Sequence, residues 1–183
     1  YGQPVSGARV SLAIPLLSPE GSTTLGAAMA GAPALICLWA SWCAPCLAEK
    51  PSFDRLASRL DAAGARIKLL SIRAFDGPPD LNGAIAMYHR LGLRHLRPYV
   101  DATAEGDSGF VAYLGVAVGQ RPSLPTALLL DADGRDIGRR RLSALYFENS
   151  AAEENLTFEQ MMERHPPTSF WDDQSNFEYL RSL

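Results

Sequence analysis

The sequence predicts an α/β fold, a central sheet flanked by helices. Apolar runs of strand length alternate with segments of helical periodicity along the chain. One run, residues 35–39, is continuously apolar, which is typical of a strand covered on both faces. The motif Cys43-Ala44-Pro45-Cys46 and a helical pattern follow it closely, and together they predict a strand–turn–helix unit.

Strands are expected where apolar runs are bounded by turn residues. A stretch rich in Ser, Pro and Gly at 18–22 follows the first run, and the turn at 131–134 joins the last two. The strands predicted in this way are 9–14, 35–39, 67–72, 99–101, 126–130 and 135–142.

Helices are expected where apolar residues recur at helical spacing. The pattern that begins after Cys43 ends at Gly64, and the next ends at Gly92, because glycine commonly follows the last turn of a helix. The helices predicted after the first one are therefore 82–91, which Gly92 ends, 108–116 and 172–183.

The 183 residues fit a single domain spanning 1–183. Two stretches, 118–123 and 143–169, exceed what the alternation of elements needs. We interpret both as insertions into that domain, the longer one lying before the C-terminal helix.

The composition is that of a globular protein with a substantial core, since 47% of residues are hydrophobic and 20% are charged. A formal net charge of -3 provides no electrostatic footprint for nucleic acid. The longest apolar run, 32–40, is too short to cross a membrane. The first residue is Tyr1, so the lack of a signal peptide in this sequence says nothing about the compartment.

We interpret the two cysteines of the motif as a redox pair. A helix N-terminus offers unpaired N–H groups and the positive end of the helix dipole, and both favour a thiolate over a thiol. Cys43 is therefore expected to be exposed and to attack a disulfide. Cys46, one turn into the helix, is expected to be more buried and to resolve the mixed disulfide.

Two other uses of the pair are weaker alternatives. A zinc site needs four ligands, and the other Cys and His residues form no second pair at ligand spacing. These residues are Cys37, His89, His95 and His165. A purely structural disulfide across so short a loop would gain little chain entropy.

The stretch 38–46, LWASWCAPC, resembles the active-site segment of thioredoxin-fold proteins, and it is most similar to the TlpA/ResA-like thiol–disulfide oxidoreductases of bacteria. The likeness extends over most of 7–142 and the final helix. It implies a thioredoxin-like fold with a mixed sheet and an enzyme that reduces disulfides of partner proteins. It also implies a periplasmic or extracytoplasmic location, with any membrane anchor outside this chain. No metal and no cofactor are expected besides the redox-active Cys43–Cys46 pair.

The resemblance implies roles for two prolines. Pro51 would kink the active-site helix, the alternative being that the helix begins after it. The Leu124–Pro125 bond would be cis, and the backbone of Leu124 would pair with an extended substrate segment. The alternative for Pro125 is an ordinary edge-strand proline.

The docking surface implied by the resemblance surrounds the first cysteine. Trp42 would shield Cys43 and contact the partner, since tryptophan is favoured in interfaces. Ala44 and Pro45 would complete this surface.

Glu49 lies one helical turn after Cys46, where the family carries a glutamate that acts in proton transfer. A partly buried carboxylate with a raised pKa can accept the Cys46 proton; the alternative is a solvated helix glutamate. Cys37 stands where thioredoxin carries a buried aspartate. It is either a small buried apolar residue or a third redox partner for Cys46.

The dipeptide Ala44-Pro45 contains no cation that would stabilise the Cys43 thiolate, so the protein is expected to be a reductant. Expected partners are proteins with disulfides, such as apocytochrome c or copper-site assembly factors, with electrons supplied from the membrane. The chain is expected to be a monomer. The alternatives are a copper-binding assembly protein that uses His165, and an oxidase or isomerase that runs the same pair in the opposite direction. A peroxiredoxin-like peroxidase is not supported by the sequence. Those enzymes carry a threonine four residues before the cysteine, and no threonine stands at that place before either cysteine of the pair.

Overall fold

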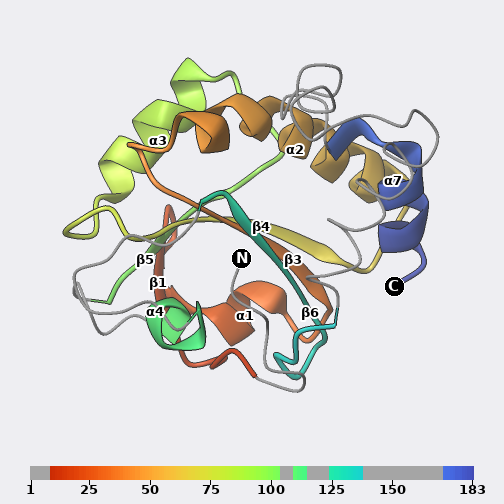
Figure 1. Cartoon of the computed structure of the whole chain (residues 1–183), viewed down its shortest axis with the longest axis horizontal. Helices are drawn as coiled ribbons and strands as arrows, with labels where there is room; N and C mark the ends of the chain where they lie inside the picture. The colour runs from red at the N-terminus through yellow and green to blue at the C-terminus, as the bar shows by residue number, and fades with distance from the viewer. Residues whose placement is uncertain (1–8, 104–108, 115–123, 138–170) are drawn as a thin grey trace, which may run out of the picture.

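A six-stranded mixed sheet runs through the centre of the molecule, and helices cover both of its faces (Figure 1). The computed structural model describes residues 9–103, 109–114, 124–137 and 171–183. The strands are β1 (Pro15–Ser18), β2 (Gly21–Thr24), β3 (Ala34–Trp39), β4 (Lys68–Arg73), β5 (Pro98–Asp101) and β6 (Thr126–Leu130). The helices are α1 (Leu25–Met29), α2 (Ala44–Ala62), α3 (Leu81–Arg90), α4 (Gly109–Leu114) and α7 (Gln174–Arg181).

The strand order is β2-β1-β5-β4-β3-β6. The pairs β3–β4 and β4–β5 are parallel, whereas β6 is antiparallel to β3 and β1 is antiparallel to both β5 and β2. The predicted mixed sheet is therefore confirmed, and β3, which lies between β4 and β6, is the strand that leads into the cysteine motif.

Strand β3 contributes to two separate cores because its side chains alternate between the faces of the sheet. Leu35, Cys37 and Trp39 pack under α2, α3 and α7. Ile36 and Leu38 pack on the other side, against α1 and α4. This double coverage explains why the strand is apolar at nearly every position.

The predicted strand at 9–14 is wrong. Only Arg9 forms a bridge there, to Arg135, while the strands lie further on, in the β1–β2 hairpin. The segment 9–14 instead packs beside the turn after β6, where the Val10 N–H donates to the Gly134 carbonyl at 2.9 Å. The turn of the hairpin lies within the predicted 18–22 stretch, and Gly21 adopts a φ of +119° there, which disfavours residues with a side chain.

The other predicted elements agree with the structure wherever it describes them, except the strand 135–142, whose described residues form no strand. Helix α2 ends shortly before Gly64, α3 ends shortly before Gly92, and α7 carries the buried Phe177 and Leu180. Beyond the turn at 131–134, Arg135 and Asp136 form isolated bridges, and 138–142 lie outside the described residues. Both proposed insertions, 118–123 and 143–169, also lie outside them, so the single domain with two insertions stays a prediction. Within the described ranges no helix has the length and apolar character that a membrane span requires.

Candidate active site

The cysteine pair lies at the N-terminus of α2, directly after β3. Cys43 is the N-cap residue, Ala44 begins the helix and Pro45 follows in the first turn, where a proline is tolerated because its missing N–H would have no partner within the helix. A disulfide joins Cys43 to Cys46. The Cys46 N–H donates to Cys43 Sγ at 3.3 Å, so a helix-terminal N–H acts on this sulfur as expected.

Cys43 is more buried than expected. Its exposed fraction is 4%, against 0% for Cys46, so the order of exposure agrees with the prediction but the exposed thiol does not. The reason is the cap itself, since Cys43 Sγ turns back onto the first turn of the helix and bonds to Cys46. Ala44 and Pro45 are exposed beside it.

Trp42 is the exposed aromatic residue at the motif, with an exposed fraction of 38%. Its indole Nε1 donates to the Phe75 carbonyl at 3.1 Å, in the loop between β4 and α3. Trp42, Ala44 and Pro45 thus lie at the surface around the buried disulfide, as a docking surface requires.

The Leu124–Pro125 peptide bond is cis. Both residues are half-buried and immediately precede β6. In the antiparallel β3–β6 pair, Thr126 lies opposite Leu38, so the prolyl turn comes at the end of β3 from which the cysteine motif leaves. The position agrees with the role that the resemblance implies for Leu124 and Pro125, and that role stays a prediction.

Glu49 is buried under α2, with an exposed fraction of 5%. This excludes the solvated helix glutamate. The Cys37 thiol donates to Glu49 Oε1, with the two heavy atoms 3.1 Å apart. Burial raises the pKa of Glu49 to about 7, although the hydrogen bond from Cys37, the charge of Lys50 and the indole of Trp171 each lower it.

Cys37 is held as a thiol. Burial, together with the negative charge of Glu49, raises its pKa well above the ordinary value. It therefore acts as a hydrogen-bond donor to Glu49. The sequence offered two interpretations of Cys37, an apolar filler or a redox partner, and neither includes this contact.

Lys50 is the site residue that the sequence analysis missed. Its side chain is almost completely buried, with an exposed fraction of 1%. The Nζ atom donates to Ser71 Oγ at 2.7 Å and lies 4.0 Å from the centroid of the Trp39 ring. Burial lowers the pKa of Lys50 to about 8, against the opposing effects of Cys37 and Glu49. The one available signal was its place in the helix directly after Glu49, because a lysine is otherwise expected at the surface.

Pro51 lies inside α2, and the helix continues through it. The alternative that the helix begins after Pro51 is therefore wrong. A proline at this place frees the carbonyl oxygen four residues earlier, that of Leu47, from its usual helical bond.

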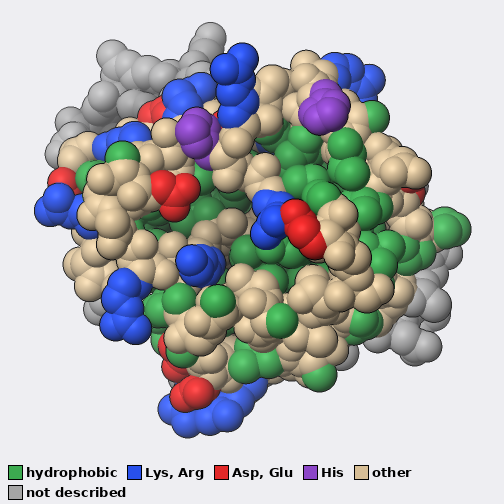
Figure 2. Space-filling view, turned by 180° about the vertical axis from the view of Figure 1, so that it is seen from behind, with side chains coloured by type: hydrophobic (Ala, Val, Ile, Leu, Met, Phe, Trp, Pro, Cys, Tyr) green, Lys and Arg blue, Asp and Glu red, His purple; other side chains and the backbone are tan. Residues whose placement is uncertain are grey.

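The metal alternatives gain nothing from the described part of the chain. No group of three or more His, Cys, Asp or Glu side chains there could hold a metal ion. His89 and His95 are exposed, and His165 lies outside the described residues. Figure 2 shows basic and acidic side chains dispersed among apolar ones on the face it presents.

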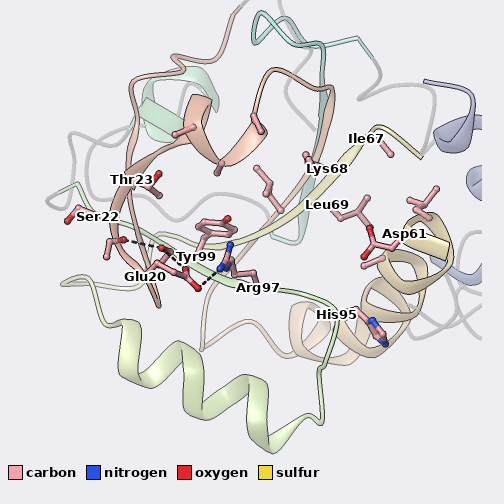
Figure 3. A pocket seen from close by; sticks show the side chains of 18 residues that line it. Glu20, Ser22, Thr23, Asp61, Ile67, Lys68, Leu69, His95, Arg97 and Tyr99 are labelled. Atoms are coloured by element: carbon pink, nitrogen blue, oxygen red, sulfur yellow. Dashed lines mark hydrogen bonds and ion pairs between the residues drawn. The ribbon is translucent and has the colours of Figure 1, made fainter. Parts of the chain in front are cut away.

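A cavity of about 660 Å³ opens elsewhere, where β4 begins and Tyr99 and Arg97 approach the β1–β2 hairpin (Figure 3). None of its lining residues belongs to the cysteine motif, which follows the opposite end of the parallel strands. Its prominent charges, Arg97 and Glu20, form an ion pair with each other. The cavity is therefore separate from the disulfide and its motif.

Comparison with known proteins gives structural relatives only, since no family model and no curated protein matches the sequence. The thioredoxin domain of a thiol-disulfide oxidoreductase from Bacteroides vulgatus matches with a TM-score of 0.53 and 15% identity, over 73% of this chain and 88% of that one. A protein assigned as the thiol:disulfide interchange protein DsbE from Chlorobium tepidum matches with a TM-score of 0.52 and 18% identity, over 82% of this chain and 98% of that one. The exposed lipoprotein thioredoxin Etrx1 of Streptococcus pneumoniae matches with a TM-score of 0.50 and 24% identity, over 68% of this chain and 84% of that one. At these identities the likeness establishes the fold: the chain has the thioredoxin fold.

Proposed function

We propose that the protein is an extracytoplasmic protein-disulfide reductase of the TlpA/ResA-like kind. The observation that supports this best is the Cys43–Cys46 disulfide on the first turn of α2, with the buried Glu49 one turn further along the same helix. Residues three apart in a helix lie on one face, so Glu49 lies on the side of Cys46. Thiol–disulfide exchange proceeds by attack of a thiolate on a disulfide. The helix N-terminus favours the thiolate of Cys43, and a buried base can accept the proton of Cys46.

The reaction begins from the reduced pair. The Cys43 thiolate attacks one sulfur of the partner disulfide, which forms a mixed disulfide and releases the other partner sulfur as a thiolate. Glu49 then accepts the proton of the Cys46 thiol. The Cys46 thiolate attacks Cys43 Sγ, so the intramolecular disulfide forms and the second partner thiolate leaves. Two electrons pass from the cysteine pair to the partner.

The direction follows from the groups around Cys43. The dipeptide Ala44-Pro45 is neutral, and the buried ammonium of Lys50 contacts Ser71 and Trp39 rather than Cys43. The Cys43 thiolate thus depends on the helix N-terminus, and the disulfide form is favoured relative to proteins with a cation between the cysteines. A measured reduction potential near that of strong oxidants, about -120 mV, would contradict this direction.

The partners in this proposal are proteins with disulfides, of the apocytochrome c or copper-site assembly kind, and the electrons return to the pair from a membrane donor. No cofactor is required besides the pair itself. The name of one structural relative, an exposed lipoprotein thioredoxin, agrees with an extracytoplasmic location.

Mixed-disulfide trapping tests the proposal. In the Cys46→Ala variant, Cys43 attacks a partner and nothing resolves the product, so the covalent complex accumulates. We expect this variant, expressed in the native cell, to form adducts that disappear on reduction and contain partner proteins identifiable by mass spectrometry.

The matched control is Cys43→Ala, which retains one cysteine of the motif but not the attacking one. It should trap few or no partners. Trapping through Cys46 alone would show that the two roles are reversed, and a lack of trapping in both variants, with the fold intact, would refute the reductase.

A further inference from the structure

A buried cluster of three ionisable groups lies beneath α2. Glu49 and Lys50 come from the helix, and Cys37 comes from β3. Cys37 bonds to Glu49, while Lys50 bonds to Ser71 of β4. Cys37 and Ser71 are directly opposite each other in the β3–β4 ladder, so both contacts lie on the same short stretch of sheet.

The described neighbours of Lys50 Nζ are three uncharged groups, namely two aromatic rings and a hydroxyl. Below it are the Trp39 ring at 4.0 Å and Ser71 Oγ at 2.7 Å. From α3, the Tyr88 ring lies 5.4 Å from Nζ, and its hydroxyl donates to the Ser71 carbonyl at 3.3 Å. The other cation near Trp39 is Arg73, whose guanidinium carbon is 5.9 Å from the ring.

The negative charge that acts on Lys50 comes from Glu49 and, if it ionises, from Cys37. A buried ammonium with only aromatic and hydroxyl neighbours is costly unless an opposite charge lies nearby. The converse holds for the Glu49 carboxylate, whose own neighbours are a thiol and an indole. Each charge therefore makes the other easier to form.

We propose that Lys50 is a positioning residue for Glu49: its buried ammonium stabilises the buried carboxylate and so sets the pH at which Glu49 can accept the proton of Cys46. This inference rests on the proposed reductase, because it concerns the step in which Cys46 resolves the mixed disulfide. Lys50 neither gains nor loses a proton in that step. It acts by keeping Glu49 ionised beforehand.

The reduced protein and dithionitrobenzoate, an aromatic disulfide, test this by separating the two thiol steps. Attack by Cys43 releases a first coloured thiolate, and attack by Cys46 on the mixed disulfide releases a second. The rate of the second release against pH reports the proton acceptor. Glu49→Gln should remove the limb of this profile that belongs to Glu49.

Lys50→Met replaces the ammonium by an apolar side chain of similar length. The rate of the second release rises with pH as Glu49 ionises, and in Lys50→Met we expect this rise to occur about one pH unit higher. Resolution is then about five-fold slower near neutral pH. The first release should keep its profile. Ser71→Ala, which removes the hydrogen-bond acceptor of Lys50 and leaves its charge, should move the limb in the same direction by less, and it serves if Lys50→Met does not fold.

Lys68→Met is the matched control, since it removes the same charge from an exposed position on β4. Its profile should be that of the wild type. An unshifted limb in both Lys50→Met and Ser71→Ala, or a uniform slowing at every pH, would overturn the proposal for Lys50. A wild type that releases only one thiolate would instead refute the proposed reductase, so the two failures are distinguishable.

Discussion

At the scale of the residue, Cys37 gives Glu49 a neutral neighbour. Where thioredoxin carries an aspartate, this chain carries a thiol that donates to the Glu49 carboxylate at 3.1 Å. A second carboxylate there would repel Glu49 and raise its pKa further, whereas a hydrogen bond to the charged form lowers it. Cys37 thus helps to keep the pKa of Glu49 near 7, within reach of ordinary physiological pH.

A pair of substitutions separates the hydrogen bond from the packing of Cys37. Cys37→Ala removes the donor, and we expect the pKa of Glu49 to rise by about one unit because a hydrogen bond to the charged form is lost. Cys37→Ser keeps a donor of nearly the same size and should leave that pKa close to the wild-type value. The carboxyl carbon resonance of Glu49, assigned by its loss in Glu49→Gln, measures both. Equal shifts in the two variants would show that packing, not the donor, acts on Glu49.

The residues of the site differ in how far the sequence reveals them. Cys43 and Cys46 follow from the spacing of the motif between a strand and a helix, which is a local property, and the role of Glu49 follows from the family resemblance. The burial of Lys50 does not, because it depends on the Trp39 ring and Ser71, which two strands place beneath the helix. The burial of Cys43 likewise depends on the orientation of one side chain at the helix cap.

At the scale of the element, the loop between β4 and α3 holds the strand–helix turn that carries the motif. Asp76 accepts from the Ser41 N–H at 2.7 Å and from the Ser41 hydroxyl at 2.9 Å. Arg73, at the end of β4, donates to Asp76 at 2.5 Å. The Phe75 carbonyl, in a backbone of φ 60°, accepts from Trp42. These bonds fix the segment just before Cys43 to the neighbouring strand.

Two isosteric substitutions test this anchor. Asp76→Asn leaves the nearly buried Arg73 without its close charge partner, and we expect it to lower the free energy of unfolding by about 2–4 kcal/mol. Asp80→Asn removes the other, exposed partner of Arg73 and retains the helix cap on α3, so it should cost less than about 1 kcal/mol. Urea unfolding of the oxidised proteins measures both. Comparable losses would mean that the Asp76 bonds do not anchor the loop.

The elements themselves were predictable where burial imposes a pattern. Strand β3 is buried at all six positions, so its sequence is a continuous apolar run. Helix α2 runs for 19 residues, so its apolar spacing repeats over several turns. Both elements are therefore visible in the sequence. Strand β2, Gly-Ser-Thr-Thr, is polar, mostly exposed and at the edge of the sheet. It has no hydrophobic alternation, and only its pairing with β1 makes it a strand. The apolar residues of 9–14 therefore give the stronger strand pattern, although the hairpin begins after them.

At the scale of the whole molecule, the C-terminal helix closes over the side of α2 that carries Glu49. The Trp171 ring packs on Phe53 with centroids 5.1 Å apart, and Arg55 forms an ion pair with Asp172 at 2.6 Å. Trp171 interacts with the buried Glu49, and Lys50 is buried against Trp39 and Ser71, so two ionisable groups sit in the core of one small protein. The cost of their burial must appear in the stability of the fold.

The pH dependence of that cost is opposite for the two groups. Burial raises the pKa of Glu49 from 4.5 to about 7, so its contribution to stability is lost as pH rises through that interval. Burial lowers the pKa of Lys50 from 10.5 to about 8, so its contribution is lost as pH falls through that interval. The oxidised protein should therefore be least stable, with respect to these two groups, between about pH 7 and pH 8.

Glu49→Gln isolates the part of the stability profile that is due to the ionisation of Glu49. Between about pH 5 and about pH 7 the wild type should lose about 2 kcal/mol of unfolding free energy that the variant retains, because glutamine does not ionise. The difference between the two proteins cancels the titrations that Glu49 does not influence, and urea unfolding at the two pH values measures it. Glu178→Gln, an exposed glutamate on α7, is the control and should follow the wild type. A Glu49→Gln variant that loses as much stability as the wild type would mean that Glu49 is not the group whose ionisation opposes folding. The same result would contradict the proposal that the charge of Lys50 stabilises a costly buried Glu49 carboxylate.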